Sequence, residues 1–162
     1  MPNGASRRLK RGVFVTLLAG PELRGCIGHV AADRPLGDVV RDMTVAAARD
    51  DPRFPPVAPD ELPGLSLEIS VLGAPAALVP VDPARVAIGR DGVIVRRGRS
   101  VGVLLPQVAP EQRLDAETFL AAACRKAGLA AGAWREPGTE VFTFSADVLR
   151  ETTEGGGEGE NV

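Results

Sequence analysis

The strongest constraint on the fold of this chain is an order of local patterns that occurs twice. A strand-like run, a short turn, a second strand-like run, an amphipathic helix and a further strand follow one another, first from the GVFV of residues 12–15 and again from the GVIV of residues 92–95. Hairpins that lead through a helix into another strand favour an antiparallel sheet with helices packed on it. The sequence therefore predicts an α+β fold of two hairpin-helix-strand units, with a largely antiparallel mixed sheet covered by flanking helices.

In the first unit, the alternation and spacing of apolar residues predict the individual elements. The expected strands are residues 13–18, 23–30 and 65–71, and the expected helix is residues 36–50. The turn of the hairpin is expected at Gly20-Pro21, because proline presets the turn dihedral, and Asp33 is expected to cap the helix. Prolines are expected to keep residues 51–64 from forming regular structure.

The second unit repeats this order. Its expected strands are residues 92–95, 101–108 and 140–146, and its expected helix begins at Asp115 and stops at Gly128. Three arginines, Arg96, Arg97 and Arg99, are expected in a solvated turn at the tip of its hairpin, because charged side chains usually occupy exposed turns.

Composition and charge limit the classes of protein to which the chain can belong. The 162 residues fit one globular domain, expected at residues 12–150, with a polar lead at residues 1–11 and a disordered tail at residues 151–162. A net charge of −2 argues against nucleic acid as a partner, and no apolar run approaches the roughly 20 residues of a membrane-spanning helix. No signal peptide and no disulfide framework are found, so a cytoplasmic location is expected.

One expected strand contains residues that packing alone does not require. Residues 23–30 read LRGCIGHV, and Cys26 stands where the second unit has Val103. Side chains alternate along a strand, which puts Arg24, Cys26 and Gly28 on one face. A guanidinium near a sulfur favours the reactive thiolate, and a glycine leaves space beside it. Cys26 and Arg24 are therefore candidate catalytic residues.

Each of these residues also has a purely structural interpretation. Free cysteine commonly behaves as a small buried hydrophobe, an alternative for Cys26 and the expectation for Cys124 on the apolar stripe of a helix. Alternation sends His29 to the face opposite Cys26, so only a bulge would let it act as a general base. Glu68 faces away from the leucines of its strand and either borders the same cleft or is an exposed carboxylate. The spacing of cysteines and histidine predicts no metal site.

Six segments occur in an order that is known from one protein family. They are GVFVTL, LRGCIG, DPRFPP, DELPGLSLEISVL, LLPQV and FLAAACRKAGL, within residues 12–149. With these segments the chain resembles the AMMECR-domain family, whose bacterial and archaeal members include AmmeMemoRadiSam system protein A. LRGCIG is the hallmark of that family. The resemblance implies an α+β domain with a larger and a smaller lobe, and it implies no settled biochemical activity.

The resemblance also implies where a functional region lies. By position, this region is the LRGCIG motif of residues 23–28. Its neighbours from the proline-rich loop are Asp51, Arg53, Phe54, Pro55 and Pro56. Together with the analysis of the strand faces, the candidate substrate-binding residues are Arg24, Gly25, Gly28, Arg53, Phe54 and Glu68. Prokaryotic relatives occur alongside a Memo-like protein and a radical S-adenosylmethionine protein, which implies a shared pathway or complex.

Two functions follow from these expectations. The first is a cytoplasmic component of that system with a small-molecule cleft, where Cys26 is a nucleophile or ligand contact and Arg24 holds an anionic group. It predicts an accessible sulfur. The second is a non-catalytic interaction or adaptor module that docks partner proteins, and it predicts a buried Cys26 and an exposed apolar patch around Phe54 and Pro55. The sequence names no substrate, no cofactor and no reaction.

Overall fold

The structure, a computed structural model, describes residues 9–151. The chain divides into two compact units, one formed by residues 9–71 together with residues 148–151 and the other by residues 72–147. Each unit contains a hydrophobic core, and the strands form two four-stranded sheets. The predicted α+β class is confirmed, with the difference that the strands form two separate sheets where one was expected.

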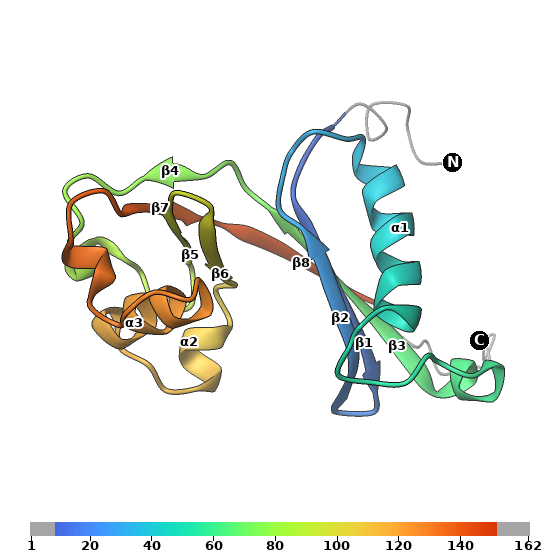
Figure 1. Ribbon diagram of the computed structural model, residues 1–162. Helices are drawn as coiled ribbons and strands as arrows, with labels where there is room; N and C mark the ends of the chain where they lie inside the picture. Colours follow the sequence, from blue (N-terminus) through green and yellow to red (C-terminus); the bar gives the residue numbers. More distant parts are fainter. Residues whose placement is uncertain (1–8, 152–162) are drawn as a thin grey trace, which may run out of the picture. The chain divides into compact units, whose positions relative to one another are not determined.

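The first unit is a sheet with one helix packed on it (Figure 1). Its strands, in the order β2-β1-β3-β8, are β1 (Val13–Ala19), β2 (Glu22–His29), β3 (Leu65–Leu72) and β8 (Ala146–Arg150). The helix α1 (Leu36–Arg49) packs on β1 and β2, and its Val39 is buried with Val13, Val15 and Leu17. These alternate residues of β1 share one face of the sheet, so the residues between them point away from α1.

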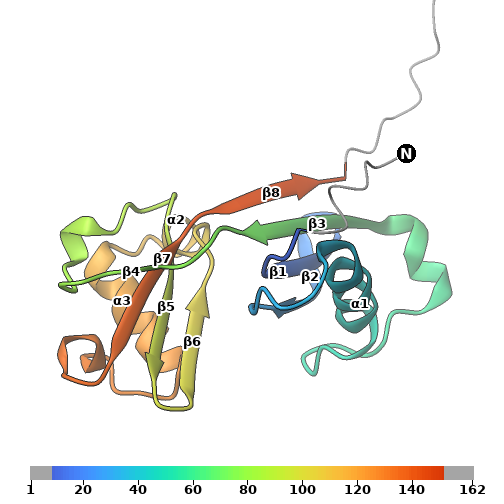
Figure 2. The same cartoon turned by 90° about the horizontal axis from the view of Figure 1, so that it is seen from above.

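The second unit has the same architecture (Figure 2). Its strands, in the order β4-β7-β5-β6, are β4 (Ala76–Ala77), β5 (Gly92–Arg97), β6 (Ser100–Leu104) and β7 (Glu140–Phe144). The helix α3 (Ala116–Lys126) packs on β5 and β6 and buries Phe119 and Leu120. It begins beside Asp115, close to the expected start, and the Asp115 carboxylate caps it by accepting the Thr118 N–H at 2.8 Å. Shorter helical segments are α2 (Val108–Glu111), η1 (Pro59–Gly64), η2 (Pro83–Arg85) and η3 (Ala133–Arg135).

The strand connections of the two units correspond. β1 pairs antiparallel with β2 and β3, and β5 pairs antiparallel with β6 and β7. A Cβ atom on Gly25 of β2 would lie 2.2 Å from the carbonyl oxygen of Ala47, and one on Gly102 of β6 would lie 2.2 Å from that of Ala123. The predicted order of elements in the repeat is thus confirmed, and the two glycines make Cys26 equivalent to Val103. Strand pairing then makes Ile94 equivalent to Thr16, two residues away from the Phe14 that the GVFV and GVIV segments align with it.

Two of the expected strands are wrong in extent. Residues 101–108 are not one strand: β6 ends at Leu104 and α2 follows, because Pro106 has no N–H to donate to a ladder. Residues 140–146 were expected as one strand but divide between β7 and β8, which belong to different sheets. The break falls at Ser145, whose carbonyl oxygen accepts the Gly73 N–H at 2.7 Å.

Helix and loop ends also differ from expectation. Asp33 does not cap α1, since Pro35 is the N-cap residue and has no side-chain cap. The proline-rich loop contains the 3₁₀ helix η1, a tight turn that begins with a proline. Glu151, assigned to the tail from the sequence, exchanges hydrogen bonds with Leu67. The rest of the expected tail, and residues 1–8 of the lead, lie outside the described residues. None of the helices within residues 9–151 has the length and apolar character to cross a membrane.

Candidate functional site

Cys26 lies near the middle of β2, an edge strand of the first sheet. Gly25 faces α1 and Ile27 packs against the core below that helix, so the Cys26 side chain points to the opposite face. The Cys26 residue is half-buried, and its sulfur accepts a hydrogen bond from the Thr16 hydroxyl, with 3.3 Å between oxygen and sulfur.

This cysteine belongs to a polar row that crosses three strands. Cys26 is paired with Thr16 on β1, and Thr16 is paired with Glu68 on β3. The equivalent row of the second unit, on β6, β5 and β7, consists of Val103, Ile94 and Phe142. The same backbone arrangement therefore accepts three apolar side chains, and sheet packing by itself does not require the polar ones.

Both glycines around Cys26 have structural partners. Gly25 permits the close approach of β2 to α1. At Gly28, a Cβ atom would lie 2.4 Å from the ring of Phe14, its neighbour across the hairpin. The expectation that Gly28 leaves space beside the sulfur is wrong, because this aromatic ring covers it.

A buried carboxylate, which the sequence indicated only as a loop neighbour, organises the region. One oxygen of Asp51 accepts the backbone N–H of Cys26 at 2.9 Å and Nη2 of Arg53 at 2.7 Å. The other accepts the backbone N–H and Nε of Arg53, both at 3.0 Å. These hydrogen bonds, above all those from the guanidinium, hold the pKa of Asp51 well below its usual range. Asp51 is 4% exposed and joins the loop to the edge of the sheet.

Arg53, and not Arg24, is the cation linked to Cys26. The pKa of Arg53 is raised mainly by its hydrogen bonds to Asp51, the carboxylate that also accepts the Cys26 backbone N–H. Arg24 instead donates through Nε and Nη2 to Glu61, at 2.8 and 3.1 Å, and that pair neutralises its charge. The sequence indicated Arg24 as the cation beside Cys26, whereas in the structure Arg53 of the proline-rich loop shares Asp51 with Cys26.

The same loop places an aromatic ring between the two arginines. The guanidinium carbons of Arg24 and Arg53 lie 5.9 and 5.5 Å from the centre of the Phe54 ring. Phe54 is half-buried, whereas Pro55 and Pro56 are exposed. The candidate residues Arg24, Arg53 and Phe54 are thus brought together, with Arg53 more than half exposed to solvent.

Glu68 lies on the same face of the sheet as Cys26. Its carboxylate accepts Nε of Arg150 on β8 at 2.7 Å, and its side chain is only 13% exposed. The open alternative of an exposed strand carboxylate is therefore wrong. Glu68 instead adjoins Thr16, the residue that donates to the Cys26 sulfur.

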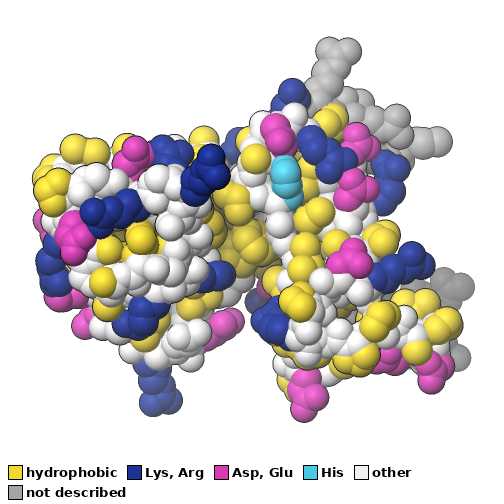
Figure 3. All heavy atoms as spheres, viewed as in Figure 1, with side chains coloured by type: hydrophobic (Ala, Val, Ile, Leu, Met, Phe, Trp, Pro, Cys, Tyr) yellow, Lys and Arg dark blue, Asp and Glu magenta, His cyan; other side chains and the backbone are white. Residues whose placement is uncertain are grey.

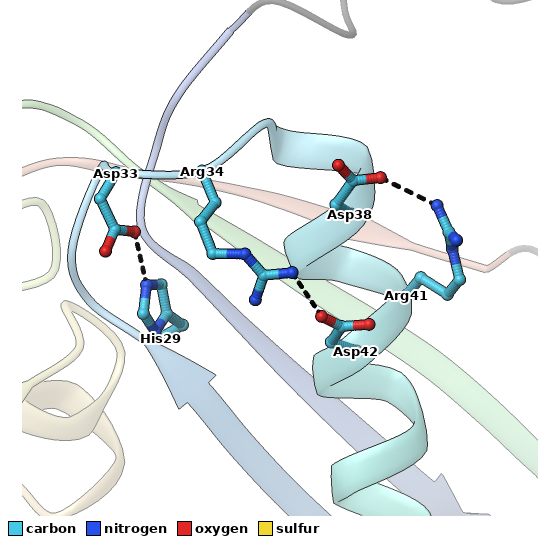
Figure 4. A network of polar contacts seen from close by, with 6 residues as sticks. All are labelled: His29, Asp33, Arg34, Asp38, Arg41 and Asp42. Atoms are coloured by element: carbon cyan, nitrogen blue, oxygen red, sulfur yellow. Dashed lines mark hydrogen bonds and ion pairs between the residues drawn. The ribbon is translucent and has the colours of Figure 1, made fainter.

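His29 takes part in a different set of contacts. Its Nε2 lies 2.7 Å from a carboxylate oxygen of Asp33, and the contact lowers the pKa of Asp33 (Figure 4). Ion pairs of Arg34 with Asp42 and of Arg41 with Asp38 continue the network along α1. Figure 3 shows this histidine, in cyan, with acidic and basic side chains around it. The structure thus gives His29 no contact with Cys26.

Cys124 is fully buried in the core of the second unit, as expected, and burial raises the pKa of its thiol. Among residues 9–151 no three His, Cys, Asp or Glu side chains are gathered so that they could hold a metal ion.

Comparison with known proteins decides the family. The AMMECR1 family profile matches residues 2–149. The chain belongs to the AMMECR1 family. AMMECR1 relatives include a protein of Methanothermobacter thermautotrophicus, 47% identical over 89% of this chain and 77% of that protein. Another, from Methanosarcina barkeri, is 46% identical over 88% of this chain and 71% of that protein.

A solved structure supports the AMMECR1 fold. The crystal structure of an uncharacterized protein from Pyrococcus horikoshii is 39% identical and matches with a TM-score of 0.87, over 93% of this chain and 78% of that one. The names of these relatives state no activity.

Proposed function

We propose that this AMMECR1 protein binds a small molecule at β2 and that Cys26 contacts or attacks it. The observation that carries the proposal is the polar row of Cys26, Thr16 and Glu68, where the equivalent sheet has three apolar side chains. Compared with the isoleucine and phenylalanine at the equivalent positions, threonine and glutamate lose buried apolar area. The second unit shows that this fold accepts apolar side chains at those positions. A role in binding or chemistry accounts for that loss.

The surroundings of the sulfur support a reactive cysteine. The Thr16 hydroxyl donates to it, and Arg53 donates to Asp51, the carboxylate that accepts the Cys26 N–H. A half-buried sulfur with polar neighbours is open to attack an electrophile and displace its leaving group, through its thiolate form. Arg53 also keeps an exposed guanidinium beside the site, with Nη1 making no hydrogen bond among the described residues. In this proposal Arg53 holds an anionic group of the ligand, the role that the sequence suggested for Arg24, and Arg24 orients Phe54.

The test is the alkylation rate of the two cysteines in the folded protein. Iodoacetamide is added near neutral pH, and the modified peptides are quantified by mass spectrometry over time. We expect Cys26 to react at least about tenfold faster than Cys124, because the Cys124 thiol is buried and its pKa is raised. If both cysteines react only after unfolding, Cys26 is not a chemical site.

An adaptor module is the second candidate function. The exposed Pro55 and Pro56 beside the half-buried Phe54 favour it, since they form an apolar surface on the loop. We propose that both candidates act in the cytoplasm, which the cysteine content of the sequence suggests, and, from the family resemblance, alongside a Memo-like protein and a radical S-adenosylmethionine protein. Binding of these two purified proteins to wild type, Pro55→Asp and Cys26→Ser separates the candidates. Docking predicts loss with Pro55→Asp and no change with Cys26→Ser.

A further inference from the structure

The loop between α1 and η1 alternates between half-buried and exposed side chains with a period of three. Over residues 54–59, which read FPPVAP, Phe54 and Val57 are half-buried, and Val57 packs against the core of the first unit. The residues between and after them are exposed, namely Pro55, Pro56, Ala58 and Pro59. A polyproline II helix has three residues per turn, so two turns of such a helix lying on the protein produce this pattern.

The backbone of the segment agrees with that conformation. Proline fixes its own φ at about −65° and biases the residue before it towards extended backbone. Ala58, which precedes Pro59, has a φ of −85° and a ψ of 152°. The carbonyl oxygens of Pro55 and Pro56 accept no hydrogen bond from any residue that the structure describes, and solvated backbone is typical of polyproline II.

The segment is held in place from its inner side. The N–H of Val57 donates to the carbonyl oxygen of Ala48, near the end of α1, at 2.8 Å. The N–H of Ala58 donates to the carboxylate of Glu61 at 2.7 Å. A partner that binds the outer side therefore meets a segment that is already ordered, and binding loses little chain entropy.

The outer side carries two dipeptides that each end in proline. Pro55-Pro56 and Ala58-Pro59 are three residues apart, so they lie on one side of the helix, about 9 Å apart along its axis. Pro56 and Pro59 thus have P-x-x-P spacing. Grooves lined by aromatic side chains recognise this spacing in a preformed polyproline II helix.

We infer that residues 54–59 are a docking segment for a protein with an aromatic-lined groove that recognises polyproline II helices. Pro56 and Pro59 enter that groove, while Phe54 and Val57 stay against the first unit. The inference rests on the adaptor candidate, for which it names the class of partner, and it needs no chemistry at Cys26.

The probe for the test is a panel of purified SH3 and WW domains, titrated into the whole chain by calorimetry. At least one domain is expected to bind saturably, one per chain, and to lose binding when an aromatic residue of its groove is replaced by lysine. Pro56→Ala and Pro59→Ala are each expected to weaken binding about tenfold, because each removes roughly two methylene groups from the groove. Pro63→Ala changes an exposed proline of η1, outside the segment, and is expected to bind like wild type.

Circular dichroism checks the fold of each variant. If Pro59→Ala alters the fold, since Pro59 begins η1, Pro56→Ala and the groove variant decide. Absence of saturable binding across the panel, wild-type affinity in Pro56→Ala, or an equal loss in Pro63→Ala would each overturn the inference. Binding of the Memo-like protein that is lost in Pro55→Asp, when no domain of the panel binds, would support the adaptor candidate and overturn this inference alone.

Discussion

The carbonyl oxygen of Ala47 lies 2.2 Å from the point where a Cβ atom on Gly25 would stand, so β2 and α1 meet through their backbones. Gly102 and Ala123 repeat this relationship between β6 and α3. The contact occurs in both units, although only the first carries the LRGCIG motif. It is therefore a requirement of the fold and not of the motif. Gly25 is therefore explained by helix packing, whereas Cys26 differs from its equivalent, Val103.

The contact at Gly25 predicts a loss of stability on adding one methyl group. Gly25→Ala is expected to lower the free energy of unfolding by about 1–3 kcal/mol, because a backbone oxygen cannot yield without a shift of α1. Urea denaturation followed by circular dichroism measures it. Gly37→Ala, which lies in α1 and has open space at its Cβ position, is the control and is expected to be neutral or slightly stabilising. Equal stability of the two variants would contradict the packing argument.

Asp51 predicts a dependence of stability on pH. Its pKa in the folded protein lies below the ordinary value of about 3.9, so as the pH falls the unfolded chain takes up the proton first. The stabilisation is therefore fully present above about pH 5 and is lost progressively below it. Urea midpoints of wild type and Asp51→Asn are expected to differ at pH 7 and to converge towards pH 3. A difference that stays constant over this range would show that the carboxylate charge is not the cause.

The two arginines predict different effects on the reactivity of Cys26. Arg53→Gln removes the guanidinium that neutralises Asp51 beside Cys26 and is expected to slow alkylation severalfold. Arg24→Gln is expected to change the rate less, because Arg24 pairs with Glu61, which makes no hydrogen bond to Cys26. Both rates are measured with iodoacetamide under the conditions used for wild type. A larger decrease of the rate in Arg24→Gln than in Arg53→Gln would indicate that Arg24 is the arginine that activates Cys26.

A polar atom at position 124 is expected to destabilise the hydrophobic core of the second unit. Cys124→Ser places a hydroxyl where the residue is fully buried and is expected to lower the free energy of unfolding by about 1–3 kcal/mol. Cys124→Ala removes the sulfur without adding a polar group and is expected to be less destabilising. Thermal unfolding of both variants compares them, and a serine variant as stable as wild type would argue against a dry, apolar site.

Much of the local structure was predictable because periodicity depends on neighbouring residues. The alternation in β1 and β3, the hairpins and the cap of α3 at Asp115 all follow from patterns a few residues long. Where β7 ends and β8 begins was not predictable, since Phe142, Phe144 and the residues after them continue a strand-like pattern. The change of sheet depends on which strands are available to pair, and no local sequence pattern indicates which strands those are.

The candidate site, too, was predictable from the sequence only in part. The sequence by itself determined that Cys26 departs from its equivalent Val103 and points away from the face of Gly25, because strand alternation sets the direction of each side chain. Only the tertiary structure decided which groups surround the sulfur. Asp51 is 25 positions away in the chain and reaches Cys26 because the edge of β2 has an N–H to satisfy. Phe14 fills the space at Gly28 for a similar reason: a hydrogen bond or a ring contact across strands depends on register and packing, which local sequence does not encode.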